Sequence, residues 1–246
     1  IYYYNGSEWN PESSPTTSTI YDIKIISQTD IWAVGNDIYH FNGVSWSVAY
    51  ETNTCYSIDV VSATDIYVGS INGIIYHYDG SAWTFTTANA GHIKDIQMDA
   101  SDSGWALASD GEILYYNGFG WSLQHDIERS SCTTISVSST SDIWVGSAQQ
   151  FDGVTKLGHW DGSEWLVVLN GYGRKINSMR ALSGSDIWFI GSNPYYGDSG
   201  TNISHWNGTS LQEITSPTSN TLYDIYMMSE TDGWAVGGDG VVLRYH

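Results

Sequence analysis

Basic side chains are scarce in this sequence of 246 residues. Only 8 residues are Lys or Arg, against 27 Asp and Glu, and the formal net charge is -19 at pH 7. An acidic surface of this kind repels the phosphates of nucleic acids and anionic lipid headgroups. We therefore expect neither nucleic acid nor a membrane surface as a partner.

Long apolar runs and cysteines are scarce as well. No stretch approaches the about 18 consecutive apolar residues of a membrane-spanning helix, so no membrane insertion is predicted. The two cysteines, Cys55 and Cys132, make no disulfide framework. The sequence has no initiator Met and no signal peptide and opens inside a repeat, so we expect a trimmed part of a larger multidomain protein.

Aromatic residues and glycines are plentiful. Phe, Trp and Tyr make up 14% of the sequence, with 12 Trp and 18 Tyr, which favours strands over helices. The 26 Gly against 4 Pro fit many tight turns. Low Lys, few thiols and abundant Tyr, Trp, Ser and Thr favour an extracellular or cell-surface protein. The sequence does not decide whether its three glycosylation sequons are used: Asn5, Asn202 and Asn207.

One sequence unit recurs along the whole chain. Its marker is an Asp followed by one residue and then an aromatic residue, as in Asp30-Ile31-Trp32, with one extra residue in Asp102-Ser103-Gly104-Trp105. The marker aspartates are Asp30, Asp65, Asp102, Asp142, Asp186 and Asp232. Their spacings of 35, 37, 40, 44 and 46 residues fit the four-stranded blade of a β-propeller.

Four strands are predicted in each unit. An apolar-alternating run comes first, and the Ser/Thr-Asp turn with its aromatic strand follows. A strand ending in Asn/Asp-Gly comes third, and a short strand opened by Trp ends the unit. Period-two alternation marks all four as strands, and no run has helical periodicity. The sequence therefore predicts an all-β fold, a β-propeller of four-stranded antiparallel blades that forms one domain over residues 1–246.

The strand count predicts six blades. Six first strands begin near Ile20, Cys55, Ile93, Cys132, Ile176 and Leu222. The simplest closure pairs the amino-terminal strand around Trp9 with the carboxy-terminal strands from Leu222 onward, because a closed ring has no open sheet edges. Residues 1–4 and 241–245 both resemble third strands, however, so one strand is left over and seven blades is the alternative.

Asn/Asp-Gly pairs are the sharpest local signal. A two-residue hairpin turn needs positive φ at both central positions, which Asn and Gly tolerate. The marker aspartates are predicted to cap their own turns by accepting bonds from backbone amides. The six Asn/Asp-Gly pairs begin at Asn5, Asn42, Asp79, Asn117, Asp161 and Asn207.

These motifs together resemble a known class of repeat. Asp-Ile-Trp-Ala-Val-Gly at residues 30–35 and Gly-x-x-Trp at residues 6–9 and four later places are similar to bacterial secreted BNR-type repeats. Gly-Trp-Ala-Val-Gly at residues 233–237 is similar to the propeller of photosystem II assembly factors. The sialidase Asp box shares the Gly-x-x-Trp ending, but its Asp two residues before Gly is missing here. The resemblance implies a propeller fold and carries almost no information on function.

Several conspicuous residues are interpreted as packing. Third-strand positions on different blades cannot converge on one ion, whose nitrogen ligands lie about 2 Å away, so a ring of metal-binding histidines is not predicted. Ten of the twelve Trp are interpreted as interblade core. Cys55 and Cys132 are predicted to be unpaired buried thiols, because one blade separates them. The histidines that share this position are His40, His77, His159 and His205.

The first strands carry a second candidate pattern. Asp22, Asp95 and Asp224 share one position and alternate with Ser57, Thr134 and Ser178. Around a narrow axis these side chains would line an acidic channel that holds water or, as the alternative, a structural cation. No other cofactor is predicted.

The irregular connections point to a recognition surface. Turns that join first to second and third to fourth strands lie on one rim of a propeller, and here they are short and stereotyped. Connections on the opposite rim vary in length and sequence, and variable loops on a rigid scaffold commonly carry recognition. The predicted ligand-binding residues of this loop-rich rim are Gln149, Gln150, Phe151, Asp152, Tyr172, Arg174, Asn193, Tyr195, Tyr196 and Asp198.

The leading hypothesis is a non-catalytic extracellular module that binds a glycan or a protein partner through the loop-rich rim. One alternative is a glycoside-processing enzyme, sialidase-like or of another class. It is disfavoured because the arginines fall in three repeats with no shared position, and no catalytic motif is present. The other alternative is a structural subunit of a surface assembly.

Overall fold

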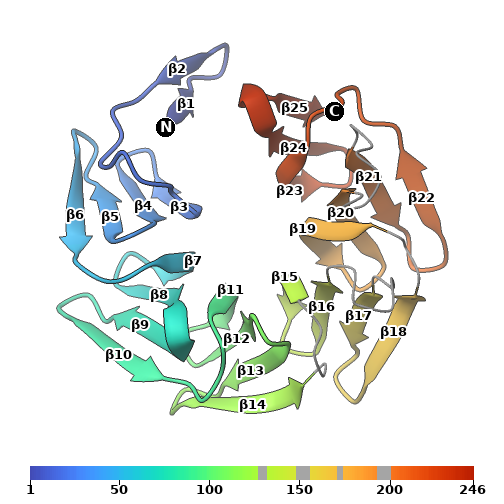
Figure 1. Cartoon of the computed structure of the whole chain (residues 1–246), viewed down its shortest axis with the longest axis horizontal. Helices are drawn as coiled ribbons and strands as arrows, with labels where there is room; N and C mark the ends of the chain where they lie inside the picture. Colours follow the sequence, from blue (N-terminus) through green and yellow to red (C-terminus); the bar gives the residue numbers. More distant parts are fainter. Residues whose placement is uncertain (127–131, 148–155, 171–173, 193–200) are drawn as a thin grey trace.

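Short antiparallel strands arranged around a central axis make up the structure (Figure 1). The computed structural model describes residues 1–126, 132–147, 156–170, 174–192 and 201–246. Each sheet runs outward from the axis, with its strands in sequence order. The structure is a six-bladed β-propeller, as the repeat count predicted.

Five blades have the predicted four strands within the described residues. The first comprises β3 (Asp22–Ser27), β4 (Asp30–Val34), β5 (Ile38–Phe41) and β6 (Trp46–Tyr50). The second comprises β7 (Cys55–Ser62), β8 (Asp65–Ser70), β9 (Ile74–Tyr78) and β10 (Trp83–Thr87). The third comprises β11 (Ile93–Ala100), β12 (Ser103–Ala108), β13 (Glu112–Tyr116) and β14 (Trp121–Asp126). The fourth comprises β15 (Cys132–Ser139), β16 (Asp142–Ser147), β17 (Lys156–Trp160) and β18 (Trp165–Asn170). The fifth comprises β19 (Lys175–Ser183), β20 (Asp186–Ser192), β21 (Thr201–Trp206) and β22 (Leu211–Ile214).

The two chain ends form separate sheets. The sixth blade has three strands, β23 (Leu222–Ser229), β24 (Asp232–Gly237) and β25 (Val242–Tyr245). At the other end, β1 (Tyr2–Tyr4) pairs with β2 (Trp9–Pro11) in a sheet of two strands. Among the strands that the structure describes, the predicted closure, in which the strand around Trp9 joins the strands from Leu222 onward in one sheet, is not seen.

The core lies between blades rather than inside any one sheet. Second-strand residues of one blade face the first and second strands of the next, as Trp32 and Val34 pack against Ile58 and Val68. Five such buried clusters join the six blades in chain order. A strand with a blade on each side buries both of its faces, which explains why β8 and β12 are buried along nearly their whole length.

The stereotyped turns gather at one rim, as predicted. A Cβ added at Gly43 would lie 2.7 Å from Cβ of Thr29, and at Gly80 it would lie 2.7 Å from Cβ of Thr64. The two kinds of turn in one blade therefore touch each other. The opposite rim carries the connections between second and third strands, including the 3₁₀ turns Ile71–Gly73 and Gly238–Gly240.

The hairpin turns differ from the predicted type. Only the glycine of each Asn/Asp-Gly pair has positive φ, for example +88° at Gly43. Asn42 instead accepts the backbone N–H groups of Val44 at 3.0 Å and Ser45 at 3.1 Å. The connection is thus a four-residue loop closed by an Asx side chain, and it does not need the second left-handed residue of a two-residue turn.

The prediction of two free, buried cysteines is confirmed at Cys55 and Cys132. The prediction that ten tryptophans form interblade core holds fully for the second-strand residues Trp32, Trp105, Trp144 and Trp188. It is wrong for Trp9, which is 42% exposed, because no described blade covers its outer side. Within the described residues, no helix is long and apolar enough to cross a membrane.

Candidate functional site

A β-bulge marks the beginning of most first strands. The register of β7 against β8 shifts between Cys55 and Ser57, and that of β11 against β12 shifts between Ile93 and Asp95. A bulge leaves one residue unpaired and redirects its side chain. Because the beginning of a first strand pairs with the end of a second strand, these side chains lie at the loop-rich rim. The residues at the bulge position are Tyr56, Lys94, Thr133, Asn177 and Tyr223.

Three neighbouring blades combine aromatic and basic groups at this level. The ring of Tyr21 lies 5.3 Å from the ring of Tyr56, with an edge-on geometry, and the ring of His92 lies 6.0 Å from the ring of Tyr56. The ammonium of Lys94 lies 3.6 Å from the centre of the Tyr56 ring. We call these four residues the aromatic ledge.

The ledge is held in place by the backbone. The N–H of Asn72, a residue with φ of 55° in the 3₁₀ turn, donates to Nδ1 of His92 at 3.0 Å. Nδ1 is therefore an acceptor, which leaves Nε2 as the ring's donor. Burial lowers the pKa of Lys94 from its ordinary value. Half of the Tyr21 side-chain surface stays exposed, so the ledge presents rings and a cation to solvent.

The bulge position of the first strand has another role in the fourth and fifth blades. The hydroxyl of Thr133 donates to backbone carbonyls of Gly146 and Ile176, and the side-chain amide of Asn177 donates to the carbonyl of Leu222. These two side chains join blades and are not free to meet a ligand. Tyr223, on the sixth blade, is exposed again.

Nearer the middle of the first strands, the predicted channel residues join blades. Asp22 accepts the N–H of Ile58 at 3.0 Å, and Asp95 accepts the N–H of Ile135 at 2.9 Å. The hydroxyl of Ser57 lies between the two carboxylates, 3.3 Å from Asp22 and 3.4 Å from Asp95. Each carboxylate thus holds the next blade by its backbone.

Burial determines the charge of this group of residues. It raises the pKa of Asp95 to about 7 and that of Asp22 to about 6, against the opposing effects of backbone hydrogen bonds and the Lys24 ammonium. Burial alone would lower the pKa of Lys24, but Asp59, 3.2 Å away, and the other carboxylates raise it overall. Asp224, the third predicted channel residue, instead accepts the hydroxyl of Ser178 at 2.6 Å.

A metal site is not supported by the side chains that the structure describes. Within those residues, no group of three or more His, Cys, Asp or Glu is placed to hold an ion. Asp22 and Asp95 share the Ser57 hydroxyl, Asp95 also accepts the Thr134 hydroxyl at 3.2 Å, and both carboxylates accept backbone N–H groups. The group therefore fits an interblade hydrogen-bond network better than a cation site.

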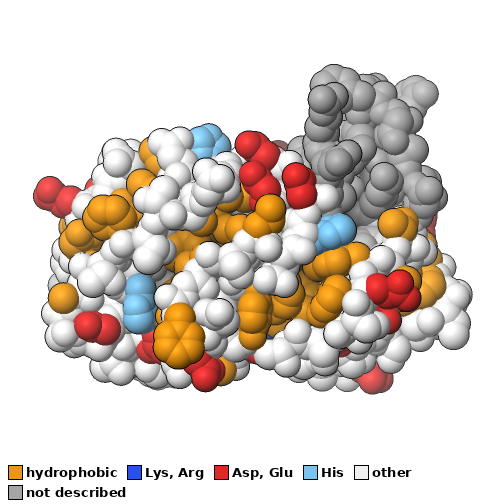
Figure 2. Space-filling view, turned by 90° about the horizontal axis from the view of Figure 1, so that it is seen from below, with side chains coloured by type: hydrophobic (Ala, Val, Ile, Leu, Met, Phe, Trp, Pro, Cys, Tyr) orange, Lys and Arg blue, Asp and Glu red, His pale blue; other side chains and the backbone are white. Residues whose placement is uncertain are grey.

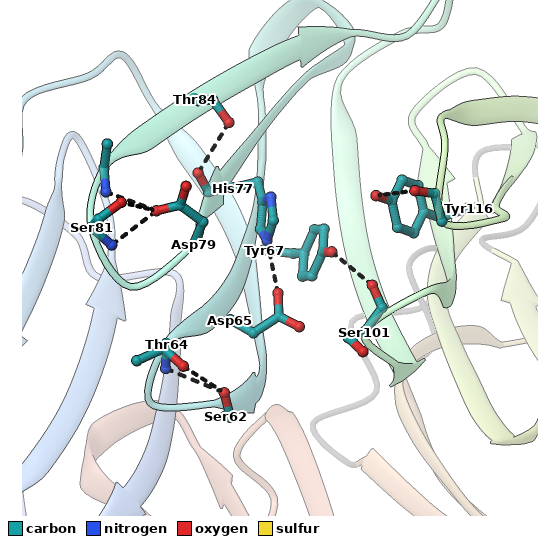
Figure 3. A network of polar contacts seen from close by, with 12 residues as sticks. Ser62, Thr64, Asp65, Tyr67, His77, Asp79, Ser81, Thr84, Ser101 and Tyr116 are labelled. Carbon is teal, nitrogen blue, oxygen red and sulfur yellow. Dashed lines mark hydrogen bonds and ion pairs between the residues drawn. The ribbon is translucent and has the colours of Figure 1, made fainter.

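The four repeat histidines each stay within their own blade. His77 Nε2 lies 2.7 Å from Asp65 Oδ1, and its ring stacks on Tyr67 at 4.3 Å (Figure 3). The same contact with the marker aspartate recurs at His40, His159 and His205. The predicted packing role is confirmed. The marker carboxylates bind side chains here, which differs from the predicted capping of backbone amides.

Most of the predicted ligand-binding residues lie outside the described residues: Gln149, Gln150, Phe151, Asp152, Tyr172, Asn193, Tyr195, Tyr196 and Asp198. Arg174 is described, and it lies half-buried directly before β19. The aromatic ledge was not predicted from the sequence, because ligand binding was assigned to the long connections and not to the beginnings of the first strands. A signal was present, because the residue before each axial Asp, Ser or Thr is aromatic or basic in four of the six repeats: Tyr21, Tyr56, Lys94 and Tyr223.

Acidic residues dominate the charge elsewhere on the surface. Figure 2 shows one side of the ring, where Asp and Glu side chains are scattered among hydrophobic ones. Lys94 is one of only eight Lys and Arg in the chain. A cation placed against an aromatic ring at the loop-rich rim is therefore a local exception to the protein's overall charge.

Comparison with known proteins shows the fold alone. No protein-family profile matches the sequence, and no curated protein matches it. The structure is similar to YCF48 bound to D1 peptide, with a TM-score of 0.71 and 17% identity over 94% of this chain and 79% of that one. YCF48 from Cyanidioschyzon merolae gives a TM-score of 0.72 and 16% identity over 98% and 86%.

A third similar structure is the extracellular domain of BT4673 from B. thetaiotaomicron. It has a TM-score of 0.74 and 17% identity, and the match covers 99% of this chain but only 35% of that one. Identities this low support a shared architecture and no shared chemistry. The resemblance to the propeller of photosystem II assembly factors, drawn from the repeat motifs, is thus confirmed at the level of the fold.

Proposed function

We propose that this chain is a non-catalytic extracellular binding module whose aromatic ledge recognises a protein segment. The observation that carries the proposal is the placement of Lys94 3.6 Å over the Tyr56 ring, with Tyr21 5.3 Å from the same ring, in a chain whose net charge is -19. Tyrosine presents a rigid apolar face and a polar tip, which suits contact with polypeptide side chains and backbone.

The fold supports binding rather than turnover. One similar structure is that of YCF48 with a bound D1 peptide, and another is an extracellular domain. The buried carboxylates of the first strands accept interblade N–H groups, so they are occupied by structural bonds. We infer that the ledge contributes affinity through ring contact and that Lys94 selects segments with a carboxylate or a backbone carbonyl at one end.

A peptide-selection experiment tests the proposal. A random peptide library displayed on phage is selected on the wild-type chain, and the selected peptides are then measured on Tyr56→Ala and Lys94→Ala. We expect at least ten-fold weaker binding to Tyr56→Ala, because a ring that contacts a ligand contributes on the order of 1–2 kcal/mol. Phe85→Ala, an exposed aromatic on β10, is the matched control and should bind as the wild type does.

Two further arms separate the alternatives. Binding to a glycan array that depends on Tyr56, without any selected peptide, would replace the protein partner by a glycan. A double variant, Tyr195→Ala with Tyr196→Ala, tests the loop residues predicted from the sequence. Turnover of a panel of chromogenic glycosides would overturn the non-catalytic part of the proposal.

A further inference from the structure

The amino-terminal hairpin occupies the place of a blade's outer half. In the first interface, Trp32 of β4 packs on Tyr78 at 5.9 Å and on Trp83 at 5.9 Å, which belong to the third and fourth strands of the next blade. The contacts of Trp234 in β24 repeat this pattern. Its partners are Tyr4 of β1 at 5.5 Å and Trp9 of β2 at 5.9 Å.

The hairpin is therefore the third and fourth strand of a position that follows the sixth blade in the ring. Tyr4 and Trp9 pair at 5.3 Å, as Tyr78 and Trp83 do at 5.2 Å. Third strands elsewhere pair with a second strand on their inner side. Within the described residues, β1 pairs only with β2, so its inner edge is open (Figure 1).

One flank of this position is an uncovered apolar face on β3. Ile23 corresponds by register to Ile58 and Ile96, which are fully buried against the preceding blade. Ile23 is 41% exposed and Ile25 is 70% exposed. The difference arises because, in the part of the chain that the structure describes, no inner strand packs between β3 and the sixth blade.

The other flank is an uncovered face on the sixth blade. Val236 of β24 corresponds to Val34, and Val242 of β25 corresponds to Ile38. Val34 and Ile38 are fully buried, whereas Val236 is 40% exposed and Val242 is 38% exposed. Trp234 lies on the same side of the sixth blade. It contacts Tyr4 and Trp9 of the outer hairpin, but no inner strand packs beside it within the described residues.

The interblade hydrogen bonds are unfilled on both flanks. Asp22 and Asp95 each accept an N–H from the first strand of the next blade. Asp224 holds the equivalent position, but the backbone N–H it accepts is that of its own neighbour, Ile225, at 2.9 Å. On β3, the N–H of Ile23 is likewise bound by its own neighbour, Asp22, at 2.7 Å.

We propose that this position binds an antiparallel two-stranded hairpin with the first- and second-strand pattern of this repeat, supplied by another polypeptide segment. The hairpin's second strand adds to the open edge of β1 by backbone hydrogen bonds. Its first strand presents an N–H to Asp224 and an Asp, Ser or Thr acceptor to the N–H of Ile23. Apolar side chains on both of its faces cover Ile23 and Ile25 on one side and Val236 on the other.

The continuity of the ring identifies the occupant. Such strand pairs make the five interfaces between the six blades. In the position that follows the sixth blade, the outer aromatic pair, Tyr4 and Trp9, already packs on Trp234. The adjoining pair Phe41 and Trp46, 5.5 Å apart, corresponds to Tyr78 and Trp83 and is placed to receive a second-strand aromatic. A single extended peptide would leave either the edge of β1 or the face of β3 uncovered.

The test supplies the chain with a copy of its own strand pair. A 20-residue segment, residues 93–112, is fused ahead of Ile1, because Tyr4 corresponds to Tyr116 and Ile1 then takes the place of Ile113. We expect amide hydrogen exchange in residues 22–27 and 222–227 to slow at least ten-fold. A fusion of the same residues in scrambled order is the control and should leave the exchange unchanged.

A second arm does not depend on the fusion. A free peptide of residues 93–108 is titrated into the 246-residue chain, and binding is followed by the same exchange measurement. Ile25→Asp should abolish the protection, whereas Val44→Asp, an exposed aliphatic in a turn of the same blade, should retain it. Absence of protection in both the fusion and the titration would overturn the proposal. So would protection that rises with concentration of the chain alone, because a second copy would then be the occupant.

Discussion

Nε2 of His159 lies 2.7 Å from Oδ1 of Asp142, a residue on the adjacent strand of the same blade. The same oxygen accepts the indole N–H of Trp144 at 3.1 Å, and the imidazole and indole rings stack at 4.1 Å. One carboxylate thus fixes a histidine and a tryptophan, as Asp30 does with His40 and Trp32 in the first blade. It ties the third strand to the second where the sheet meets the next blade.

Asp142→Ala should lower the free energy of unfolding by about 1–3 kcal/mol, because the indole and imidazole N–H groups lose their acceptor in a partly buried place. Chemical denaturation measures the change. Asp99→Ala, at an exposed aspartate, is the control and should stay within about 0.5 kcal/mol of the wild type. Equal loss in both variants would contradict the role given to the carboxylate.

The free energy of unfolding should fall as the pH rises from about 4 to about 7, to the extent that Asp95 and Asp22 determine it. Burial raises the pKa of Asp95 to about 7 and that of Asp22 to about 6. The native state then binds more protons than the unfolded state in this range, so deprotonation costs stability. The slope from these two groups disappears above about pH 8, where both carboxyls are deprotonated in the folded and the unfolded state.

Asp95→Asn should flatten that part of the pH profile. The amide oxygen can still accept the N–H of Ile135, so the interblade bond survives while the titrating group is removed. Denaturation midpoints measured from pH 4 to pH 8 in both proteins test this. Profiles of the same slope would show that the carboxyl is not protonated in the folded protein near neutral pH.

Gly80→Ala should destabilise the protein by about 1–2 kcal/mol or more, because φ there is +87°, a conformation that is costly for a residue with a Cβ. The added Cβ would also lie 2.7 Å from Cβ of Thr64. Gly120→Ala is the matched control, since nothing lies within 4 Å of its Cβ and its φ is not in the left-handed region. Thermal unfolding of the two variants should separate them clearly.

Both cysteines should resist modification in the native protein. Burial raises the pKa of Cys132 to about 12 and raises that of Cys55 as well, so little of the reactive thiolate forms at pH 8. Ellman's reagent should therefore label neither thiol until denaturant is added, and two thiols per chain afterwards. Rapid labelling of one thiol without denaturant would show that its blade interface opens readily.

Part of the candidate site was within reach of the sequence. The repeat placed Asp22 and Asp95 at one position of the first strand, and register alone puts that position at the same height on each blade. The sequence could not show that Ser57 lies between these two aspartates or that each aspartate holds the next blade by its backbone. The sequence also carried the recurrence of aromatic and basic residues before the axial position, but it could not show where Tyr56 and Lys94 point, because a bulge decides that.

The repeat period, strand alternation and turn residues by themselves determined the six-bladed fold, since each is a local property that one blade repeats. Closure of the ring depends on which strands from the two chain ends meet, and the local sequence pattern does not determine this. Only the tertiary structure showed Tyr4 and Trp9 seated on Trp234 while Ile25 is left exposed. The physical reason is that a blade's faces are buried by its neighbours, so a missing neighbour changes exposure without changing any local sequence signal.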